Sequence, residues 1–176
     1  MDEFWDIYDE NRTKLEGVHK RGEKIPTGQR HIVMHLCIFD KNNKLLIQKR
    51  TKSKGKFSEL WDVSVGGSAL AGETSAQGIK RECAEELGLT LPLERFHVLM
   101  TLHGPHYFDD YYVIHEDVDL NSLKLQKDEV EEVRWASREE VLHLLHSDQF
   151  VPWQESFITF LFNIASADVF QGMIAR

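Results

Sequence analysis

The chain has 176 residues, of which 41% are hydrophobic and 28% are charged, and its formal net charge is −8. This composition is that of an ordinary folded protein, and the length is enough for one domain with a single sizeable core. The acidic balance argues against general nucleic-acid binding, which depends on basic surfaces.

The apolar stretches are too short to span a membrane, because a spanning helix needs about 20 apolar residues. Residues 2–6 are Asp-Glu-Phe-Trp-Asp and lack the basic and apolar regions of a secretion signal. The two cysteines, Cys37 and Cys83, lie in apolar runs, which favours buried, reduced thiols over a disulfide. We therefore expect a cytoplasmic protein without a membrane span.

The first half of the chain reads mainly as strands. Residues 4–8 and 14–18 flank a polar turn and predict an N-terminal β-hairpin. Residues 31–40 are β-branched and apolar, and residues 45–50 return after an Asn-Asn turn as a second hairpin. A further strand is expected at residues 61–65, before Gly66 and Gly67.

Helical patterning begins at residue 73 and ends at Leu87. Thr74 is the expected N-cap, Gln77 stands in capping-box register, and Gly88 is the expected C-terminal stop. Ser137 has capping-box spacing ahead of a short helix, and Pro152 is expected to open a longer one. Further strands are predicted at residues 96–103, 107–115 and 130–136.

This order of elements predicts an α/β sandwich with a mixed sheet, because neighbouring strands joined by turns are interrupted by one long helix. We expect a single domain over residues 1–176. Within it, residues 1–30 form an N-terminal hairpin extension and residues 152–176 a C-terminal helix. No internal repeat or linker divides the chain.

Three carboxylates stand out on the predicted helix. Glu82, Glu85 and Glu86 are spaced i, i+3 and i+4, which places all three on one helical face. Like charges at this spacing repel, so the arrangement calls for a compensating cation. Hard oxygen ligands on a rigid element suit Mg²⁺ or Mn²⁺, and such ions suit phosphate chemistry.

Residues 67–89 resemble the Nudix box, the pattern G-x5-E-x7-R-E-U-x-E-E-x-G-U in which U is apolar. A chance match to all of its fixed positions is on the order of one in a million or less. The only deviation is Cys83, which packs as a small hydrophobe where an aliphatic residue is more usual. The matching positions are Gly67, Glu73, Arg81, Glu82, Glu85, Glu86 and Gly88.

The resemblance implies a Nudix-type α/β/α sandwich that uses Mg²⁺ or Mn²⁺ to hydrolyse a diphosphate linkage in a small molecule, typically a nucleoside diphosphate joined to another group. By position, Glu82, Glu85 and Glu86 would be metal ligands, together with the backbone carbonyl of Gly67. Many members of the family are homodimers, which makes a homodimer an expectation here.

The same resemblance gives two other box residues a positioning role, because Glu73 and Arg81 would form an ion pair that orients the helix and its carboxylates. The general base is left open between Glu82, our first choice, and Glu129, our second. Further acidic candidates lie outside the helix: Asp109, Asp110, Asp128, Glu131 and Glu132.

Two groups outside the box are candidates for substrate contacts. A basic patch in an otherwise acidic chain includes Lys49, Arg50 and Lys52, which are expected to contact phosphates. The predicted strand pair also holds four aromatic residues on which a nucleobase could stack. They are Tyr107, Phe108, Tyr111 and Tyr112.

Two alternatives compete with the hydrolase hypothesis. Residues 45–50 and 61–67 resemble the Nudix branch related to isopentenyl-diphosphate isomerase, but that enzyme has a catalytic cysteine and a metal-binding histidine where this chain has Gly66 and Ser68. The missing thiol acid and the intact box favour hydrolysis. A non-catalytic nucleotide-binding module is the second alternative, although no box glutamate is lost.

Overall fold

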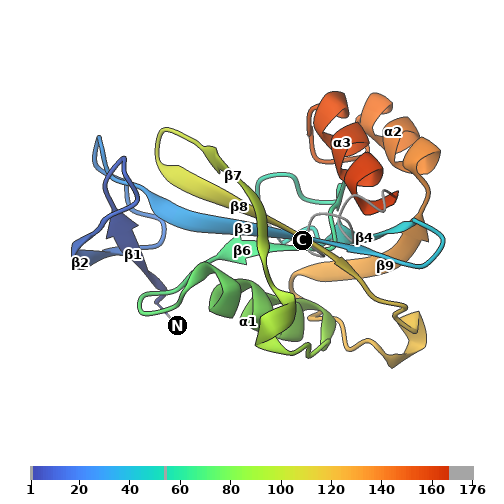
Figure 1. The fold of residues 1–176 in the computed structure, drawn as a ribbon, viewed down its shortest axis with the longest axis horizontal. Coiled ribbons are helices and arrows are strands. Elements are labelled where there is room, and N and C mark those ends of the chain that lie inside the picture. Colours follow the sequence, from blue (N-terminus) through green and yellow to red (C-terminus); the bar gives the residue numbers. More distant parts are fainter. Residues whose placement is uncertain (1, 54, 167–176) are drawn as a thin grey trace, which may run out of the picture.

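The computed structural model describes residues 2–53 and 55–166 (Figure 1). At one end of the molecule, β1 (Phe4–Tyr8) and β2 (Lys14–Lys20) form a separate antiparallel sheet, which confirms the predicted hairpin. Trp5 of β1 stacks on His31 with their ring centroids 4.0 Å apart. This stacking joins the hairpin to the start of the central sheet.

The central sheet is mixed, as predicted. Its strands follow the order β5-β4-β3-β8-β7, with β6 also paired to β3 and β9 also paired to β4. The β3–β8 pair is parallel, and the other pairs are antiparallel. The strand bounds are β3 His31–Phe39, β4 Leu45–Arg50, β5 Trp61–Asp62, β6 Val65–Ser68, β7 Val98–His103, β8 Tyr107–His115 and β9 Val130–Ala136.

Helices cover both faces of this sheet, so the predicted α/β/α sandwich is confirmed (Figure 1). On one face lies α1 (Ser75–Leu87), and on the other lie α2 (Arg138–His146) and α3 (Glu155–Ser166). Short 3₁₀ turns occupy Leu93–Arg95 and Leu120–Ser122. No helix within residues 2–53 and 55–166 is long and apolar enough to cross a membrane.

The alternation of side chains along β3 divides the interior into two cores. Met34 and Leu36 pack in the cluster that includes Cys83 of α1. Cys37 and Phe39 point to the other face and pack with residues of α2 and α3. Both cysteines are buried and free, as their apolar surroundings in the sequence predicted.

Helix α1 has the predicted ends. The Thr74 hydroxyl accepts a hydrogen bond from the Gln77 backbone N–H, and the Gln77 side chain accepts one from the Thr74 N–H, which completes the capping box. Gly88 closes the helix in the left-handed conformation, with φ 67°. These caps fix where the helix starts and stops relative to its carboxylates.

The single strand expected at residues 61–65 is in fact two strands, and this prediction was wrong. β5 pairs with β4, whereas β6 pairs with β3. Ser64 lies between them, fully buried, and its hydroxyl accepts from the Ile38 N–H at 2.8 Å and donates to the Leu46 carbonyl at 2.5 Å. The serine side chain thus bridges β3 and β4 where they separate, and the chain crosses from one strand to the other.

The last helix also differs from the prediction, because α3 begins at Glu155 and not at Pro152. Residues before it run beside β5, where the Val151 N–H donates to the Trp61 carbonyl at 2.8 Å. The Trp153 indole N–H then donates to Asp62 at 3.0 Å. These contacts keep the segment extended. The remainder of the predicted helix, residues 167–176, lies outside the described residues.

Candidate functional site

Glu82 and Glu86 lie one helical turn apart on α1, Glu82 partly buried and Glu86 fully buried. The Glu86 side chain is fully buried and accepts a hydrogen bond at 2.9 Å from the Gln48 amide of β4. Glu82 is packed against Gly67 of β6, where an added Cβ would lie 2.3 Å from the Glu82 Oε1. Only glycine fits at residue 67 with the carboxylate in this position.

Arg81 ties the acidic residues of the site together. Its Nε donates to Glu73 Oε1 at 2.8 Å, and its Nη1 lies 3.0 Å from Glu82 Oε1. A further hydrogen bond of 3.1 Å reaches the backbone carbonyl of Ser68 in β6. The expected Glu73–Arg81 ion pair is thus present in the structure, and it links the helix to the loop before it and to the sheet.

Burial dominates the electrostatics of Glu82. The loss of solvent raises its pKa to about 7, the charge of Arg81 opposes this shift, and the charge of Glu86 adds to it. A carboxylate so placed is stabilised in its ionised form by any nearby cation. Glu82 and Glu86 therefore provide hard oxygen donors that favour a bound cation.

Glu85 is the most exposed of the three carboxylates. Its side chain is 51% exposed and forms a 2.9 Å ion pair with Arg81, so it lies toward solvent while Glu82 and Glu86 lie inward. Across the described residues, no three His, Cys, Asp or Glu side chains are arranged as a ready metal site. Glu82 and Glu85 both contact Arg81 Nη1, at 3.0 Å and 2.9 Å, while Glu86 lies deeper against Gln48.

The acidic loop that precedes β9 lies against the end of α1. The Gln126 N–H donates to the backbone carbonyl of Glu86 at 3.0 Å, and the Glu129 N–H donates to the Gln126 carbonyl at 2.9 Å. This brings Glu129 close to the box helix. Two other acidic candidates for the general base are engaged elsewhere. Both carboxylate oxygens of Asp110 accept hydrogen bonds from Arg12, and Glu131 forms an ion pair with Lys49 at 3.0 Å.

The three basic candidates have different surroundings. Lys49 is engaged by Glu131, and Lys52 is exposed. Arg50 donates to the backbone carbonyls of Phe57 and Lys56 and lies 3.5 Å from Asp62. Of the three, only Arg50 lines the cavity described next.

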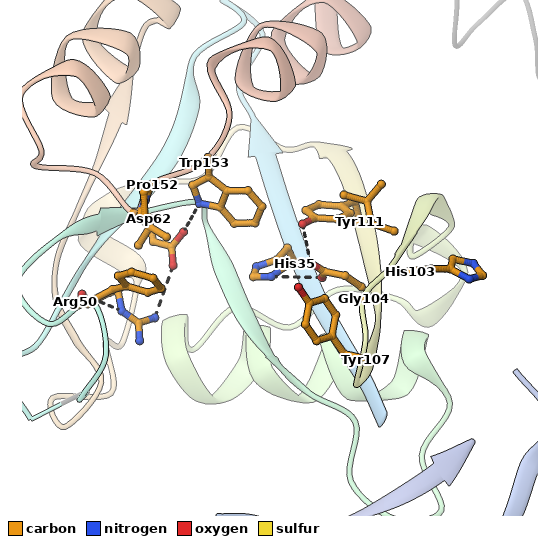
Figure 2. A pocket seen from close by; sticks show the side chains of 13 residues that line it. His35, Arg50, Asp62, His103, Gly104, Tyr107, Tyr111, Pro152 and Trp153 are labelled. Carbon is orange, nitrogen blue, oxygen red and sulfur yellow. Dashed lines mark hydrogen bonds and ion pairs between the residues drawn. The ribbon is translucent and has the colours of Figure 1, made fainter. Parts of the chain in front are cut away.

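A cavity of about 670 Å³ opens on the face of the sheet that carries α2 and α3 (Figure 2). Sequence reasoning did not identify it, because its walls come from β3, β4, β5, β8 and the segment before α3. Figure 2 shows Arg50 and Asp62 on one side of it and a cluster of rings on the other. Its principal lining residues are His35, Arg50, Asp62, Asp109, Tyr111 and Trp153.

The four aromatic residues of the predicted strand pair fall into two groups. Tyr107 and Tyr111 line the cavity. Phe108 is buried beneath Arg12 and Arg30, and Tyr112 packs in the core that faces α1. The two groups lie on opposite faces of β8, because side chains alternate along a strand. Stacking of a nucleobase therefore stays a prediction for Tyr107 and Tyr111, and the prediction is wrong for the buried Phe108 and Tyr112.

The cavity and the buried carboxylates lie on either side of two consecutive glycines of β6. An added Cβ at Gly66 would lie 3.0 Å from His35 Nδ1, in the cavity wall, whereas one at Gly67 would meet Glu82. Since neither residue has a side chain, backbone alone separates His35 from Glu82 at this point. Ser68 follows them, and its carbonyl is held by Arg81.

Comparison with known proteins agrees with this geometry. The family model of the NUDIX domain matches residues 29–159. The Nudix hydrolase lmo0368 of Listeria monocytogenes is 44% identical over 165 residues, which cover 94% of this chain and 96% of that protein.

Solved structures share the fold at lower identity. Protein DR0079 of Deinococcus radiodurans aligns with a TM-score of 0.74 and 21% identity, over 90% of this chain and 99% of that one. The NUDIX domain of Shewanella oneidensis NrtR, crystallised with ADP ribose, aligns with a TM-score of 0.54 and 20% identity, over 65% of this chain and 77% of that one.

Proposed function

This chain belongs to the Nudix family and is a hydrolase of diphosphate bonds, and we propose that it cleaves the diphosphate of a nucleoside diphosphate-linked small molecule with Mg²⁺ or Mn²⁺ as cofactor. The observation that carries the proposal is the pair of the fully buried Glu86 and the partly buried Glu82, of which Glu82 is packed against Gly67. The complex of the NrtR domain with ADP ribose, itself a nucleoside diphosphate joined to a sugar, supports this choice of substrate class.

The residues present fit a divalent cation. Glu86 offers buried carboxylate oxygens and Glu82 partly buried ones, and the absence of a side chain at Gly67 leaves room for the Glu82 carboxylate. We propose Glu82, Glu86 and Glu85 as ligands, with the Gly67 carbonyl. Such an ion supplies charge neutralisation to the phosphates and acidifies the attacking water.

The other box residues act on the carboxylates. Arg81 contacts Glu73, Glu82 and Glu85 at 2.8–3.0 Å, so it holds two proposed ligands relative to the loop that carries Glu73. Positioning of this kind contributes to catalysis because the reacting groups need no rearrangement. We propose that Glu82 accepts the proton of the attacking water at a carboxylate oxygen, with Glu129 as the second candidate.

Among the basic candidates, we propose Arg50 as the main phosphate contact, with Lys49 and Lys52 as further ones. Arg50 lies two residues after Gln48, whose amide contacts Glu86, and it also lines the cavity. A phosphate beside Arg50 would therefore be near both the carboxylates and the bound substrate group. The Asp62 carboxylate 3.5 Å away fixes the guanidinium in this place.

The test compares Glu86→Gln with Glu94→Gln, an exposed glutamate outside the site. Both variants are incubated with Mg²⁺, a panel of nucleotide-linked diphosphates and isopentenyl diphosphate, and products are followed by ³¹P NMR. We expect Glu86→Gln to lose about 10²- to 10³-fold in turnover, because a charge-stabilising group is removed from the reacting centre, and Glu94→Gln to keep the wild-type rate.

Other outcomes contradict the proposal. Equal rates in the two variants would exclude Glu86 from the site. Rearranged isopentenyl diphosphate with intact phosphates would indicate the isomerase, which Gly66 and Ser68 disfavour. Nucleotide binding without turnover of any panel member would indicate the binding module.

Three finer expectations accompany this function. The free, buried cysteines suit a reducing compartment, which supports a cytoplasmic location. The homodimer suggested by the family resemblance stays a prediction, as does the boundary of a single domain over residues 1–176.

A further inference from the structure

Asp109 of β8 is a buried acid in the cavity wall with unused hydrogen-bonding capacity. The residue is 8% exposed, and its Oδ2 accepts a 2.6 Å hydrogen bond from the Tyr111 hydroxyl. Its Oδ1 lies 3.3 Å from His35 Nε2 but finds no aligned hydrogen-bond partner among the described residues. A buried acceptor left in this condition costs free energy unless a ligand provides a donor.

Aromatic rings surround this carboxylate. His35 stacks on Tyr111 with centroids 5.3 Å apart, and Trp153 meets His35 edge-on at 4.8 Å. The Trp153 indole is held by its hydrogen bond to Asp62. In Figure 2, His35, Tyr107 and Tyr111 lie on the side of the cavity away from Arg50, and Trp153 lies beside Asp62, between them and Arg50. Such flat walls suit a planar ligand group.

Charges elsewhere in the cavity are already matched. Asp62 is paired with Arg50 and accepts from Trp153, so its oxygens are engaged. Asp109 Oδ1, enclosed beside His35, is therefore the carboxylate oxygen of the cavity wall that still lacks an aligned donor among the described residues. An ionised carboxylate accepts hydrogen bonds and donates none, so it selects an N–H over a carbonyl oxygen.

From these contacts we infer that the cavity binds the nucleobase of the substrate and that Asp109 selects a base carrying an exocyclic amino group. The inference rests on the proposed function, since it assigns the nucleoside half of the substrate to this cavity. The volume of about 670 Å³ is in the range of small-molecule sites. With the base against these rings, the phosphates would lie toward Arg50, which follows Gln48 by two residues in β4.

The test measures binding without turnover. AMP and CMP are each compared with the analogue in which hydrogen replaces the amino group, by calorimetric titration in the absence of metal. We expect AMP or CMP to bind about 10- to 100-fold more tightly than its analogue, the range for a hydrogen bond to a charged group. The Trp153 indole N–H resonance, assigned by its absence in Trp153→Phe, should shift on binding.

The matched variants are Asp109→Asn and Asp148→Asn. In the first, the Tyr111 hydroxyl holds the new amide oxygen, so the amide nitrogen faces the ligand and the preference for the amino base should fall to within about twofold. Asp148 is exposed and has φ 56°, which asparagine also adopts, so Asp148→Asn should keep the preference.

Several results overturn the inference: equal affinity within both wild-type pairs, a preference that survives Asp109→Asn, or no binding of any of the four nucleotides. The comparison of AMP and CMP with their analogues on the wild-type protein tests the inference even if Asp109→Asn fails to fold. Because no turnover is measured, loss of hydrolysis in Glu86→Gln and loss of base preference in Asp109→Asn are separate outcomes.

Discussion

At the scale of single residues, the site depends on close contacts between groups that are far apart in the sequence. Gln48 reaches Glu86 from β4, and Gly67 lies directly against Glu82. Helical spacing alone places the glutamates on one helical face, and the resemblance to the Nudix box correctly predicted the Glu73–Arg81 pair. It does not reveal that Glu85 turns to solvent, because that depends on which carboxylates the sheet buries.

The contact at Gly67 gives a prediction at this scale. Gly67→Ala should lower the free energy of unfolding by about 1–3 kcal/mol, the usual cost of overpacking, because the new methyl group overlaps the Glu82 carboxylate. In a Glu82→Ala background the same change should cost much less, since the overlapping atoms are gone.

Urea unfolding of the four proteins in this double-mutant cycle measures the coupling. An equal cost of Gly67→Ala in both backgrounds would show that Glu82 does not occupy the space beside residue 67. The catalytic role of Gly67 would then lose its structural support.

At the scale of elements, local signals predicted the helices better than the paths between strands. The caps of α1 and α2 are encoded by residues three positions apart, and both capping boxes are present. The split of the strand at residues 61–65 depends on Ser64 bonding two strands distant in the sequence. Likewise, Pro152 is a good first helical residue, but pairing of the preceding segment with Trp61 delays the helix.

Because the Ser64 hydroxyl links β3 to β4, we expect it to stabilise the part of the sheet that carries the site. Ser64→Ala leaves the buried Ile38 N–H and Leu46 carbonyl without their hydroxyl partner, and should cost about 2–4 kcal/mol of unfolding free energy. Chemical denaturation followed by far-UV circular dichroism measures the change.

Ser122→Ala is the control, because its hydroxyl also donates to a backbone carbonyl, that of Asp119, but lies at an exposed position where water can replace it. A loss of similar size in both variants would mean that the bridge between β3 and β4 contributes nothing specific.

At the scale of the whole molecule, the sheet brings together two parts with different tasks. The carboxylates of α1 lie on one face, and the ring-lined cavity lies on the other, with Gly66 and Gly67 between them. The fold class was predictable because the order of elements and the box both point to it. The cavity was not, since His35, Asp62, Asp109 and Trp153 carry no shared local pattern and meet only through the strand order.

Hydrolysis at phosphorus can be followed by ³¹P NMR of the wild-type reaction in H₂¹⁸O. With Mg²⁺ and a nucleotide-linked diphosphate, we expect two phosphate-bearing products, one of which carries ¹⁸O on phosphorus, because water attacks there. Products without ¹⁸O in either phosphate, or an intact diphosphate on a rearranged organic group, would contradict it.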